Sequence, residues 1–236
     1  MRQVLERAAD RLFPDGTNEH GALPAVLVLQ TLATGIVDAV SFIGLHHVFV
    51  ANMTGNVVFL GFALAGDSSL SVRASLLALG AFSAGAWSAG RLGRRAAHPA
   101  RLFAVATAVH AVLVAAALAV DLTAGHRTDA AQTALIALLG CGMGLQNAAV
   151  RTLAVPDLTT TVLTRTLTGL AADAPGPATV RRLASLTAMF TGALCGGTLF
   201  LREGPAPALA LALVLLAVGA VPVRAGGRRL RGPAGA

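Results

Sequence analysis

The chain has 236 residues, of which 55% are hydrophobic and 12% are charged, and its mean hydropathy is +0.71. Soluble domains usually carry about twice that share of charged residues, so the composition argues against an ordinary soluble domain and favours a polytopic membrane protein. The formal charge of +7 comes from arginine, because the sequence contains no lysine. Arginine in short loops orients membrane helices, so the basic balance does not indicate nucleic-acid binding.

Residues 1–21 carry charges of both signs and lack the apolar core of a cleavable signal peptide. The apolar side chains of this segment recur at helical spacing: Val4, Leu5, Ala8, Leu12 and Phe13. We therefore expect a cytoplasmic amphipathic segment ahead of the membrane part.

A membrane-spanning helix needs roughly 20 mostly apolar residues. Six stretches reach or approach that length: Ala22–Leu45, Ala74–Gly90, Leu102–Val120, Ala130–Val150, Leu183–Leu201 and Ala206–Val223. Two further segments, Val48–Gly66 and Asp157–Ala172, are apolar but interrupted by polar residues. Each half of the chain thus has one apolar stretch, one interrupted segment and two more apolar stretches.

The arginines indicate whether the interrupted segments cross. If all eight segments crossed from an inside N-terminus, the arginines between 91 and 101 would lie outside, against the positive-inside tendency. If the interrupted segments enter and return on one side, those arginines, Arg181, Arg182 and the tail arginines all lie inside. The apolar parts of these segments, Val57–Ala65 and Thr164–Ala172, would form helices of roughly 14 Å, about half the hydrocarbon thickness. A full but broken helix is the alternative.

The two halves also echo each other in sequence. The echoes are 35–39 with 144–148, 52–57 with 162–167, and 82–86 with 190–194, at offsets of 147 − 38 = 109, 164 − 54 = 110 and 190 − 82 = 108. Three matches in one order and at nearly one offset predict an internal duplication, which in membrane proteins often surrounds a transport site. Because each half would cross three times, the two halves would be inverted relative to each other.

We therefore predict an all-α polytopic membrane protein with six transmembrane helices and two short re-entrant or broken half-helix segments, arranged as two inverted repeats. The first repeat covers 22–120 and the second 130–223, followed by an Arg-rich cytoplasmic tail at 224–236. We expect it in a bacterial cytoplasmic (inner) membrane with both termini cytoplasmic.

Two motifs carry a family resemblance. The runs Val37-Asp38-Ala39-Val40-Ser41-Phe42 and Asn52-Met53-Thr54-Gly55-Asn56, with Gly85 and Gly90-Arg91 further on, resemble the YoaK-type family of bacterial membrane proteins. The resemblance covers roughly Leu23 to Val223. It implies a six-helix inner-membrane protein and supplies no substrate or reaction, since this is a domain-of-unknown-function family.

Asp38 is the candidate with the clearest chemistry, because a carboxylate inside a membrane helix is costly unless it is paired, hydrated or protonated. It either serves a proton- or ion-linked or solute-binding site, or it has a structural role as the partner of an arginine or a cap for broken backbone. Its counterpart by the repeat offset is Asn147, which keeps the shape and loses the charge. Arg165 is the preferred partner for Asp38, with Arg151 as the alternative.

The remaining candidate pathway residues lie at the apices of the interrupted segments: Asn52, Thr54, Gly55 and Asn56 in the first, and Thr164 and Arg165 in the second. Short polar side chains satisfy freed backbone groups, and glycine permits a tight bend. They would either line a pathway or simply form a satisfied re-entrant turn.

The other polar residues give weaker signals. His110, alone in an apolar stretch, is interpreted as a packed or hydrogen-bonded histidine, although a proton relay is conceivable. His46 and His47 are adjacent but lack further metal ligands, and Cys141 and Cys195 are read as small packing residues. We predict no catalytic residue, no metal site and no cofactor.

These observations favour a channel or secondary transporter for an unidentified small solute or ion. The alternative is a non-transport membrane scaffold or regulatory protein, and an enzyme is not expected. The partners predicted are the lipid bilayer and a small solute or ion but no nucleic acid, with a possible homo-oligomer formed through the small-residue helix faces.

Overall fold

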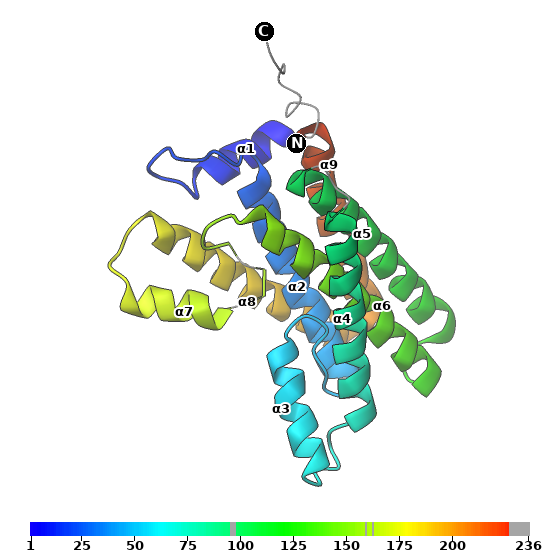
Figure 1. Cartoon of the computed structure of the whole chain (residues 1–236). Coiled ribbons are helices and arrows are strands. Elements are labelled where there is room, and N and C mark those ends of the chain that lie inside the picture. The colour runs from blue at the N-terminus through cyan, green and yellow to red at the C-terminus, as the bar shows by residue number, and fades with distance from the viewer. Residues whose placement is uncertain (95–97, 159, 162, 227–236) are drawn as a thin grey trace.

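The computed structural model describes residues 1–94, 98–158, 160–161 and 163–226, and every regular element in them is a helix. The helices are α1 (Arg2–Asp10), α2 (Leu23–Gly44), α3 (Met53–Leu64), α4 (Val72–Gly93), α5 (Pro99–Ala124), α6 (Asp129–Leu153), α7 (Leu163–Ala172), α8 (Pro177–Glu203) and α9 (Pro205–Gly226). In Figure 1, α3 extends from the bundle on one side, and α7 lies beside α8 on another. Most of the predicted tail, from residue 227 onward, lies outside the described residues.

The long helices form where the apolar stretches predict them, and local signals set their ends. Ser71 and Thr128 accept hydrogen bonds from backbone N–H groups in the first turns of α4 and α6. Such bonds satisfy donors that a helix N-terminus leaves open. Helices α5 and α8 each begin with proline and end before a glycine of positive φ, Gly125 and Gly204.

Three helix ends meet at what we call the distal end of the bundle. The Gln132 Nε2 donates to the Gly44 carbonyl oxygen at 3.4 Å, and the Arg73 Nη2 donates to the Thr133 Oγ1 at 2.8 Å. The end of α2 and the starts of α4 and α6 therefore lie together. The ring of His126, after α5, contacts the ring of Phe200 near the end of α8, with 5.7 Å between centroids.

The opposite end, which we call the proximal end, carries the N-terminal segment. The Arg181 guanidinium lies over the Phe13 ring at 4.6 Å, so the start of α8 meets the segment after α1. Asp157, just beyond α6, bonds to both Arg181 and Arg182. The end of α4, the start of α5 and the end of α6 share a cavity lined by Gly93, Pro99 and Thr152.

These contacts fix the direction of each long helix. Helices α2, α5 and α8 run from the proximal to the distal end, and α4 and α6 run back. Helix α9 begins directly after α8, and Figure 1 shows its far end beside the N-terminus. Because α2 ends where α4 begins, α3 leaves the distal end and returns to it. Because α6 ends near where α8 begins, α7 does the same at the proximal end.

Glycines allow two helix pairs to approach at backbone distance. A Cβ at Gly144 would overlap the Phe82 carbonyl of α4, and a Cβ at Gly35 would overlap the Met189 carbonyl of α8. In the same way Gly85 faces the Cys141 carbonyl, and Gly192 faces the Leu32 carbonyl. The contacts of α4 with α6 thus match those of α8 with α2. From α2 to α6 the offset is 144 − 35 = 109, and 141 − 32 gives the same value. From α4 to α8 it is 189 − 82 = 107, and 192 − 85 gives the same value.

The outer surface of the bundle is apolar. Large side chains such as Trp87, Leu122, Phe190 and Leu201 are 59%, 69%, 67% and 74% exposed. Four of the described helices, α2, α5, α6 and α8, are long and apolar enough to cross a membrane. An exposed apolar belt around apolar helices is expected where lipid, not water, is the solvent.

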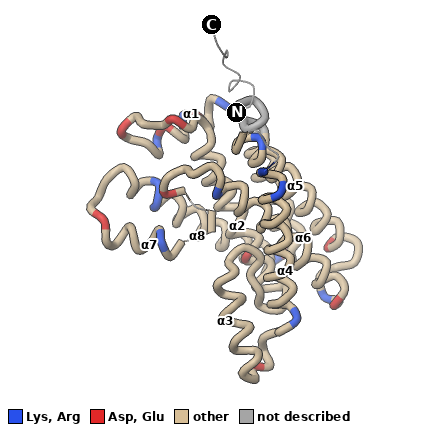
Figure 2. The backbone as a smooth tube through the Cα atoms, viewed as in Figure 1, with Lys and Arg blue, Asp and Glu red and all other residues tan. Residues whose placement is uncertain are grey.

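Charge is distributed unevenly between the two ends (Figure 2). Arginines of α1, the end of α4 and the start of α8 gather at the proximal end. At the distal end, Arg73 lines a cavity with Asp129, and Asp121 pairs with His126, next to Arg127 in the chain. The arginine excess therefore lies at the end that carries the N-terminal helix.

Candidate functional site

Asp38 caps the backbone that precedes α3. Its side chain lies in α2 and is buried, with 4% exposure. The Oδ1 accepts hydrogen bonds from the backbone N–H groups of Val50 and Ala51 at 3.0 and 2.9 Å, and the Oδ2 accepts one from the Asn52 side-chain amide. Three donors from one short segment therefore satisfy this carboxylate. Of the interpretations that the sequence allows, this geometry matches the cap for broken backbone.

Asn56 fixes the same segment from the other side. Its Oδ1 accepts from the Phe49 N–H at 2.8 Å, and its Nδ2 donates to the Phe49 carbonyl. The Phe49 ring stacks on Phe42 of α2 at 4.9 Å, and a Cβ at Gly55 would lie 2.8 Å from that ring. Thr54, in contrast, is exposed. The side chains of Asn52 and Asn56, with the space left at Gly55, therefore hold residues 49–52 in place.

Asn147 of α6 holds the second interrupted segment in a similar way. Its Oδ1 accepts from the Thr161 Oγ1 at 2.6 Å, and its Nδ2 donates to the Met143 carbonyl. Thr161 follows Asn147 by 14 residues, and Asn52 follows Asp38 by 14 residues. The two contacts are thus equivalent in spacing, but the second half uses a neutral amide where the first uses a carboxylate.

The ion pair predicted between Asp38 and Arg165 is not formed. Asp38 is occupied by Val50, Ala51 and Asn52, while Arg165 is exposed on α7. Within the described residues the Arg165 guanidinium has no ion-pair or hydrogen-bond partner. The alternative partner, Arg151, is exposed near the end of α6. The prediction failed because nearby backbone donors, which charge counting does not reveal, satisfy the carboxylate.

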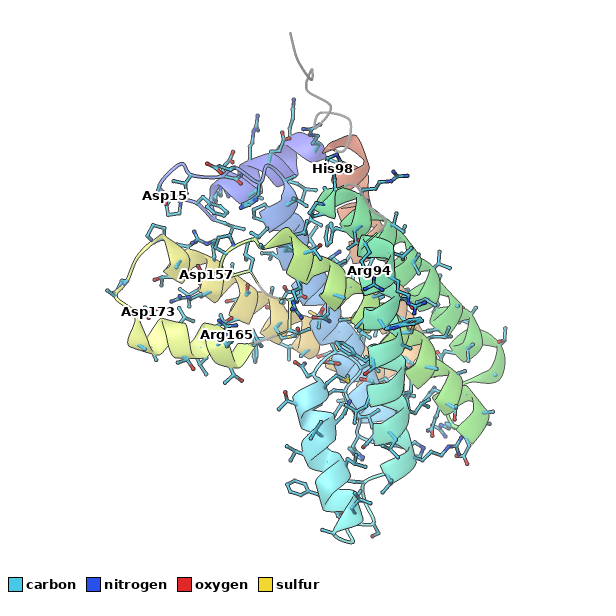
Figure 3. The ribbon with its side chains drawn as sticks, viewed as in Figure 1. Asp15, Arg94, His98, Asp157, Arg165 and Asp173 are labelled. Carbon is cyan, nitrogen blue, oxygen red and sulfur yellow. The ribbon has the colours of Figure 1, made fainter. Side chains whose placement is uncertain are left out.

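Arg165 instead lines a cavity of about 200 Å³ together with Asp157, Thr166 and Arg182. Figure 3 shows Arg165 below Asp157, at the end of α7 nearer the bundle, with Asp173 at the far end of α7. Thr164, one residue earlier on α7, is exposed. The cavity therefore lies beside the start of α7 and the start of α8, toward the proximal end.

Acidic residues that sequence analysis did not single out organise this cavity. Asp157 Oδ2 pairs with Arg181 Nη2 at 3.2 Å, and its Oδ1 pairs with Arg182 Nε at 2.9 Å. Arg182 Nη1 also pairs with Asp173 Oδ2 at 2.6 Å. The sequence interpretation used Arg181 and Arg182 only as topology markers. The signal available in the sequence was a pair of adjacent arginines preceded by two acids. Asp173 lies 9 residues before Arg182, and Asp157 lies 24 and 25 residues before the two arginines.

A buried polar layer joins α2, α5 and α6. Gln30 Nε2 donates to Thr107 Oγ1 at 2.9 Å, and His110 Nδ1 lies 2.6 Å from Gln146 Oε1. His110 also lies against Gly142, where a Cβ would come within 2.5 Å of its ring. The interpretation of His110 as a packed, hydrogen-bonded histidine is confirmed.

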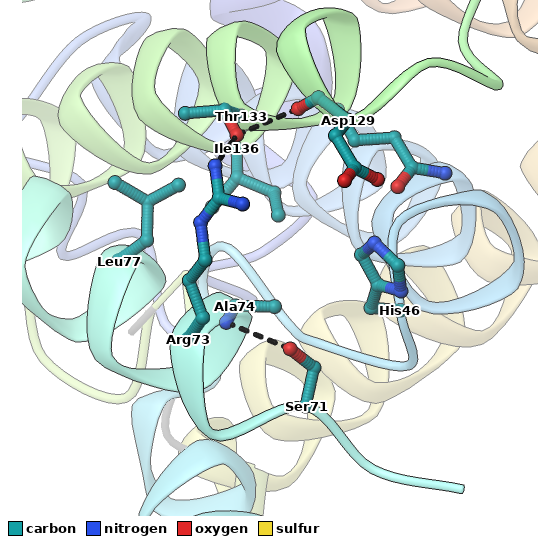
Figure 4. A pocket seen from close by; sticks show the side chains of 9 residues that line it. His46, Ser71, Arg73, Ala74, Leu77, Asp129, Thr133 and Ile136 are labelled. Atoms are coloured by element: carbon teal, nitrogen blue, oxygen red, sulfur yellow. Dashed lines mark hydrogen bonds between the residues drawn. The ribbon is translucent and has the colours of Figure 1, made fainter.

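A second polar cavity, of about 160 Å³, opens at the distal end (Figure 4). His46, Arg73, Asp129 and Gln132 contribute its polar lining. Arg73 is already bonded to Thr133, and Ser71 accepts from the Ala74 N–H. His46 and His47 both have positive φ, 58° and 57°. Among the described residues, no group of three or more His, Cys, Asp or Glu is placed to hold a metal ion.

Comparison with known proteins gives the family. Residues 26–221 match the model of the family described as Protein of unknown function (DUF1275). The chain is also 35% identical to the UPF0700 transmembrane protein YoaK of Bacillus subtilis (strain 168) over 153 residues, which are 64% of this chain and 67% of that protein. No solved structure matches. The YoaK-type resemblance is therefore confirmed, and the chain, an integral membrane protein, belongs to the DUF1275 family.

Proposed function

We propose that this protein is a channel or secondary transporter for a small solute or ion, with its pathway beside the two interrupted segments. In this proposal α2, α4, α5, α6, α8 and α9 cross the membrane, and α3 and α7 are re-entrant half-helices. The proximal end faces the cytoplasm, because it carries the arginine excess. Both chain ends would then be cytoplasmic in a bacterial inner membrane.

The observation that carries the proposal is the depth at which α3 begins. Asp38 holds residues 50–52 at a point 44 − 38 = 6 residues before the end of α2. Six helical residues correspond to about 9 Å. The chain therefore turns back into the bundle before α3 starts. Non-helical backbone at such depth is tolerated where protein buries it or where it lines a water-filled cavity.

The second half supplies a matching half-helix. Asn147 contacts Thr161 with the same spacing of 14 residues, and α7 starts soon afterwards. The glycine contacts relate α2 to α6 and α4 to α8 at nearly constant offsets. These matches support an inverted duplication, the arrangement in which transporters place substrate sites near discontinuous helices.

The test is solute flux into proteoliposomes, screened across protons, small anions, monovalent cations and small neutral metabolites. Thr54 and Thr164 are the positions to alter, because both are exposed in the first turns of α3 and α7. Gly55 is unsuitable, since a larger side chain there would strike Phe49. We expect Thr54→Leu and Thr164→Leu to reduce flux at least about tenfold, which corresponds to about 1.4 kcal/mol at the barrier.

Val58→Leu and Thr168→Leu are the matched controls, because these exposed residues lie one turn further along the same helices. They should leave flux close to wild type. If a folded, inserted protein shows no flux above empty liposomes across the whole screen, the transport proposal fails. The scaffold or regulatory role would then be the better reading.

A further inference from the structure

The polar cavity at the distal end is lined by two opposite charges that are not paired with each other. Arg73 and Asp129 both line it, from the first turns of α4 and α6. Within the described residues neither side chain has an ion-pair partner. In Figure 4 the Asp129 carboxylate points toward His46, whereas the Arg73 guanidinium lies beside Thr133. A cationic group and an anionic group therefore occupy separate positions in one cavity.

Thr133 holds the guanidinium in place without neutralising it. The Thr133 Oγ1 accepts from the Arg73 Nη2 at 2.8 Å and donates to the Asp129 carbonyl oxygen at 2.7 Å. The guanidinium is thus held against the first turn of α6 by a neutral hydroxyl. A guanidinium has five N–H donors, and one of them is used among the described residues. The others can serve a carboxylate, whose two oxygens match the planar arrangement of these donors.

Hydrogen-bond acceptors accompany Asp129 in the lining of this cavity. The Gln132 Nε2 donates to the Gly44 carbonyl oxygen, whereas the Gln132 Oε1 is buried and, within the described residues, without a partner. Gln132 lies one turn beyond Asp129 and lines the cavity together with His46. A carboxylate, an amide oxygen and a neutral imidazole nitrogen each accept a hydrogen bond. An ammonium group, which has three N–H donors and no acceptor, matches this set.

The rest of the lining limits the size of an occupant. Ala74, Leu77 and Ile136 provide an apolar wall, in which Ala74 and Ile136 are buried. A cavity of about 160 Å³ has room for about five water molecules, because each occupies about 30 Å³ in the liquid. A molecule of about five or six non-hydrogen atoms, the size of glycine or alanine, would therefore fill it. An apolar wall beside two charged positions suits an occupant with a small apolar side chain.

The packing of the helices does not require these polar groups. The glycine contacts give offsets of 109 between α2 and α6 and 107 between α4 and α8. By these offsets the counterparts of Arg73, Asp129 and Gln132 in the other half are Val180, His20 and Leu23. Neither the guanidinium, the carboxylate nor the amide is present at the equivalent place. A role in binding accounts for a set of groups that only one half carries.

We propose that this cavity binds a small zwitterion, an α-amino acid of the size of glycine or alanine, with its carboxylate on Arg73 and its ammonium group on Asp129, Gln132 and His46. His46 lies in the connection from α2 to α3, so the cavity borders the chain that leads into the first interrupted segment. The inference deepens the proposed transport function by naming its solute class, and it rests on that function where it treats the cavity as the outer entrance of the pathway. The headgroup of phosphatidylethanolamine, which joins an ammonium group to a phosphate, shares this chemistry.

The test is thermal unfolding of the full chain in nanodiscs of phosphatidylcholine, titrated with L-alanine or glycine. A ligand that binds the folded state raises the unfolding temperature in a saturable manner. We expect such a rise for the wild type. Propionate and ethylamine, which each lack one of the two charges, should bind at least about tenfold more weakly than alanine. Arg73→Gln and Asp129→Asn should each weaken the apparent alanine affinity about tenfold, the effect of losing one hydrogen bond to a charged group.

Arg127→Gln and Asp67→Asn are the matched controls, because these residues are exposed in the connections before α6 and α4 and do not line the cavity. Both variants should bind alanine like the wild type. Arg73 and Asp129 are themselves exposed, so their variants should unfold near the wild-type temperature without ligand. Absence of a saturable rise, or an equal rise in Arg73→Gln and Asp129→Asn, overturns the site. Equal affinity for propionate and alanine overturns the assignment to a zwitterion.

Nanodiscs containing phosphatidylethanolamine form the second arm. If that lipid stabilises the wild type but neither Arg73→Gln nor Asp129→Asn, and weakens the alanine response, the free amino acid is overturned as the occupant in favour of a headgroup. Binding is measured without flux, so the two proposals fail separately. Flux of another solute without alanine binding overturns this site alone, and alanine binding without any flux overturns transport alone.

Discussion

At the scale of single residues, the same type of polar contact is built with different charge in the two halves. Asp38 receives three donors from residues 50–52, and Asn147 receives one from Thr161. A carboxylate in an apolar bundle needs several donors to offset its desolvation, whereas an amide needs fewer. The charge of Asp38 therefore stabilises the turn before α3, and Arg165 remains available for another partner.

This assignment predicts how substitutions at the two residues combine. Asp38→Asn should lower the free energy of unfolding by about 1–3 kcal/mol, because it weakens charge-assisted bonds to buried donors. Arg165→Gln should change it by less than about 0.5 kcal/mol, as is usual at exposed sites. The double variant should show the sum within about 0.5 kcal/mol, since the residues share no partner. Chemical unfolding in detergent measures all three.

Asp67→Asn is the matched carboxylate-to-amide control, because Asp67 is exposed and, among the described residues, its carboxylate bonds only to Ser69. It should have little effect on the free energy of unfolding. A double variant that is more stable than the sum of the single changes predicts would instead show that Asp38 and Arg165 interact as an ion pair in the wild type.

At the scale of helices, glycine decides which pairs pack closely. Gly144 brings α6 onto the α4 backbone, and Gly35 brings α2 onto the α8 backbone. Lipid provides no hydrophobic drive for helices to associate, so close van der Waals contact through small residues takes its place. The half-helices have no such contact: α3 packs on α4 and α7 on α8 through side chains.

Glycine substitutions test this packing. Gly144→Ala should destabilise the protein by about 1–3 kcal/mol, because the added Cβ overlaps the Phe82 carbonyl and forces the helices apart. Gly80→Ala, on α4 with open space around its Cβ, should instead stabilise by about 0.5–1 kcal/mol. The unfolding temperatures of the two variants should therefore move in opposite directions. Equal shifts would mean that the close approach at Gly144 does not contribute.

The sequence predicted the positions of the helices well, but it predicted the hydrogen-bond and ion-pair partners of polar side chains less well. The stretch Ala22–Leu45 differs from α2 by one residue at each end. The start of α3 was predicted at Val57, but α3 begins at Met53, because the non-helical backbone that Asp38 holds ends at Asn52. The glycine contacts relate Phe82 to Met189, whereas the sequence echo pairs Phe82 with Phe190. Asp157 was missed because its partners only meet in the folded bundle.

At the scale of the whole molecule, the arrangement of the helix ends predicts which connections share a side of the membrane. The residues after α2, α3, α5 and α8 all lie at the distal end, and those after α1, α4, α6 and α7 lie at the proximal end. Asp67, between α3 and α4, is the most informative position. If α3 is re-entrant, Asp67 faces the same side as His47 and Arg127. If α3 crosses, Asp67 faces the side of the N-terminus.

Single cysteines report this directly, after Cys141 and Cys195 are replaced by alanine. Cysteines at His47, Asp67 and Arg127 should react with an impermeant thiol reagent added to intact cells, because these positions are exposed and lie on the arginine-poor side. Cysteines at Arg94 and Asp173 should react only after permeabilisation. Asp173 serves as the reporter just before α8 because it is exposed, whereas a thiol at the buried Arg181 would stay unlabelled on either side. Labelling of position 67 only after permeabilisation, with position 47 labelled in intact cells, would show that α3 crosses and would remove the inverted arrangement.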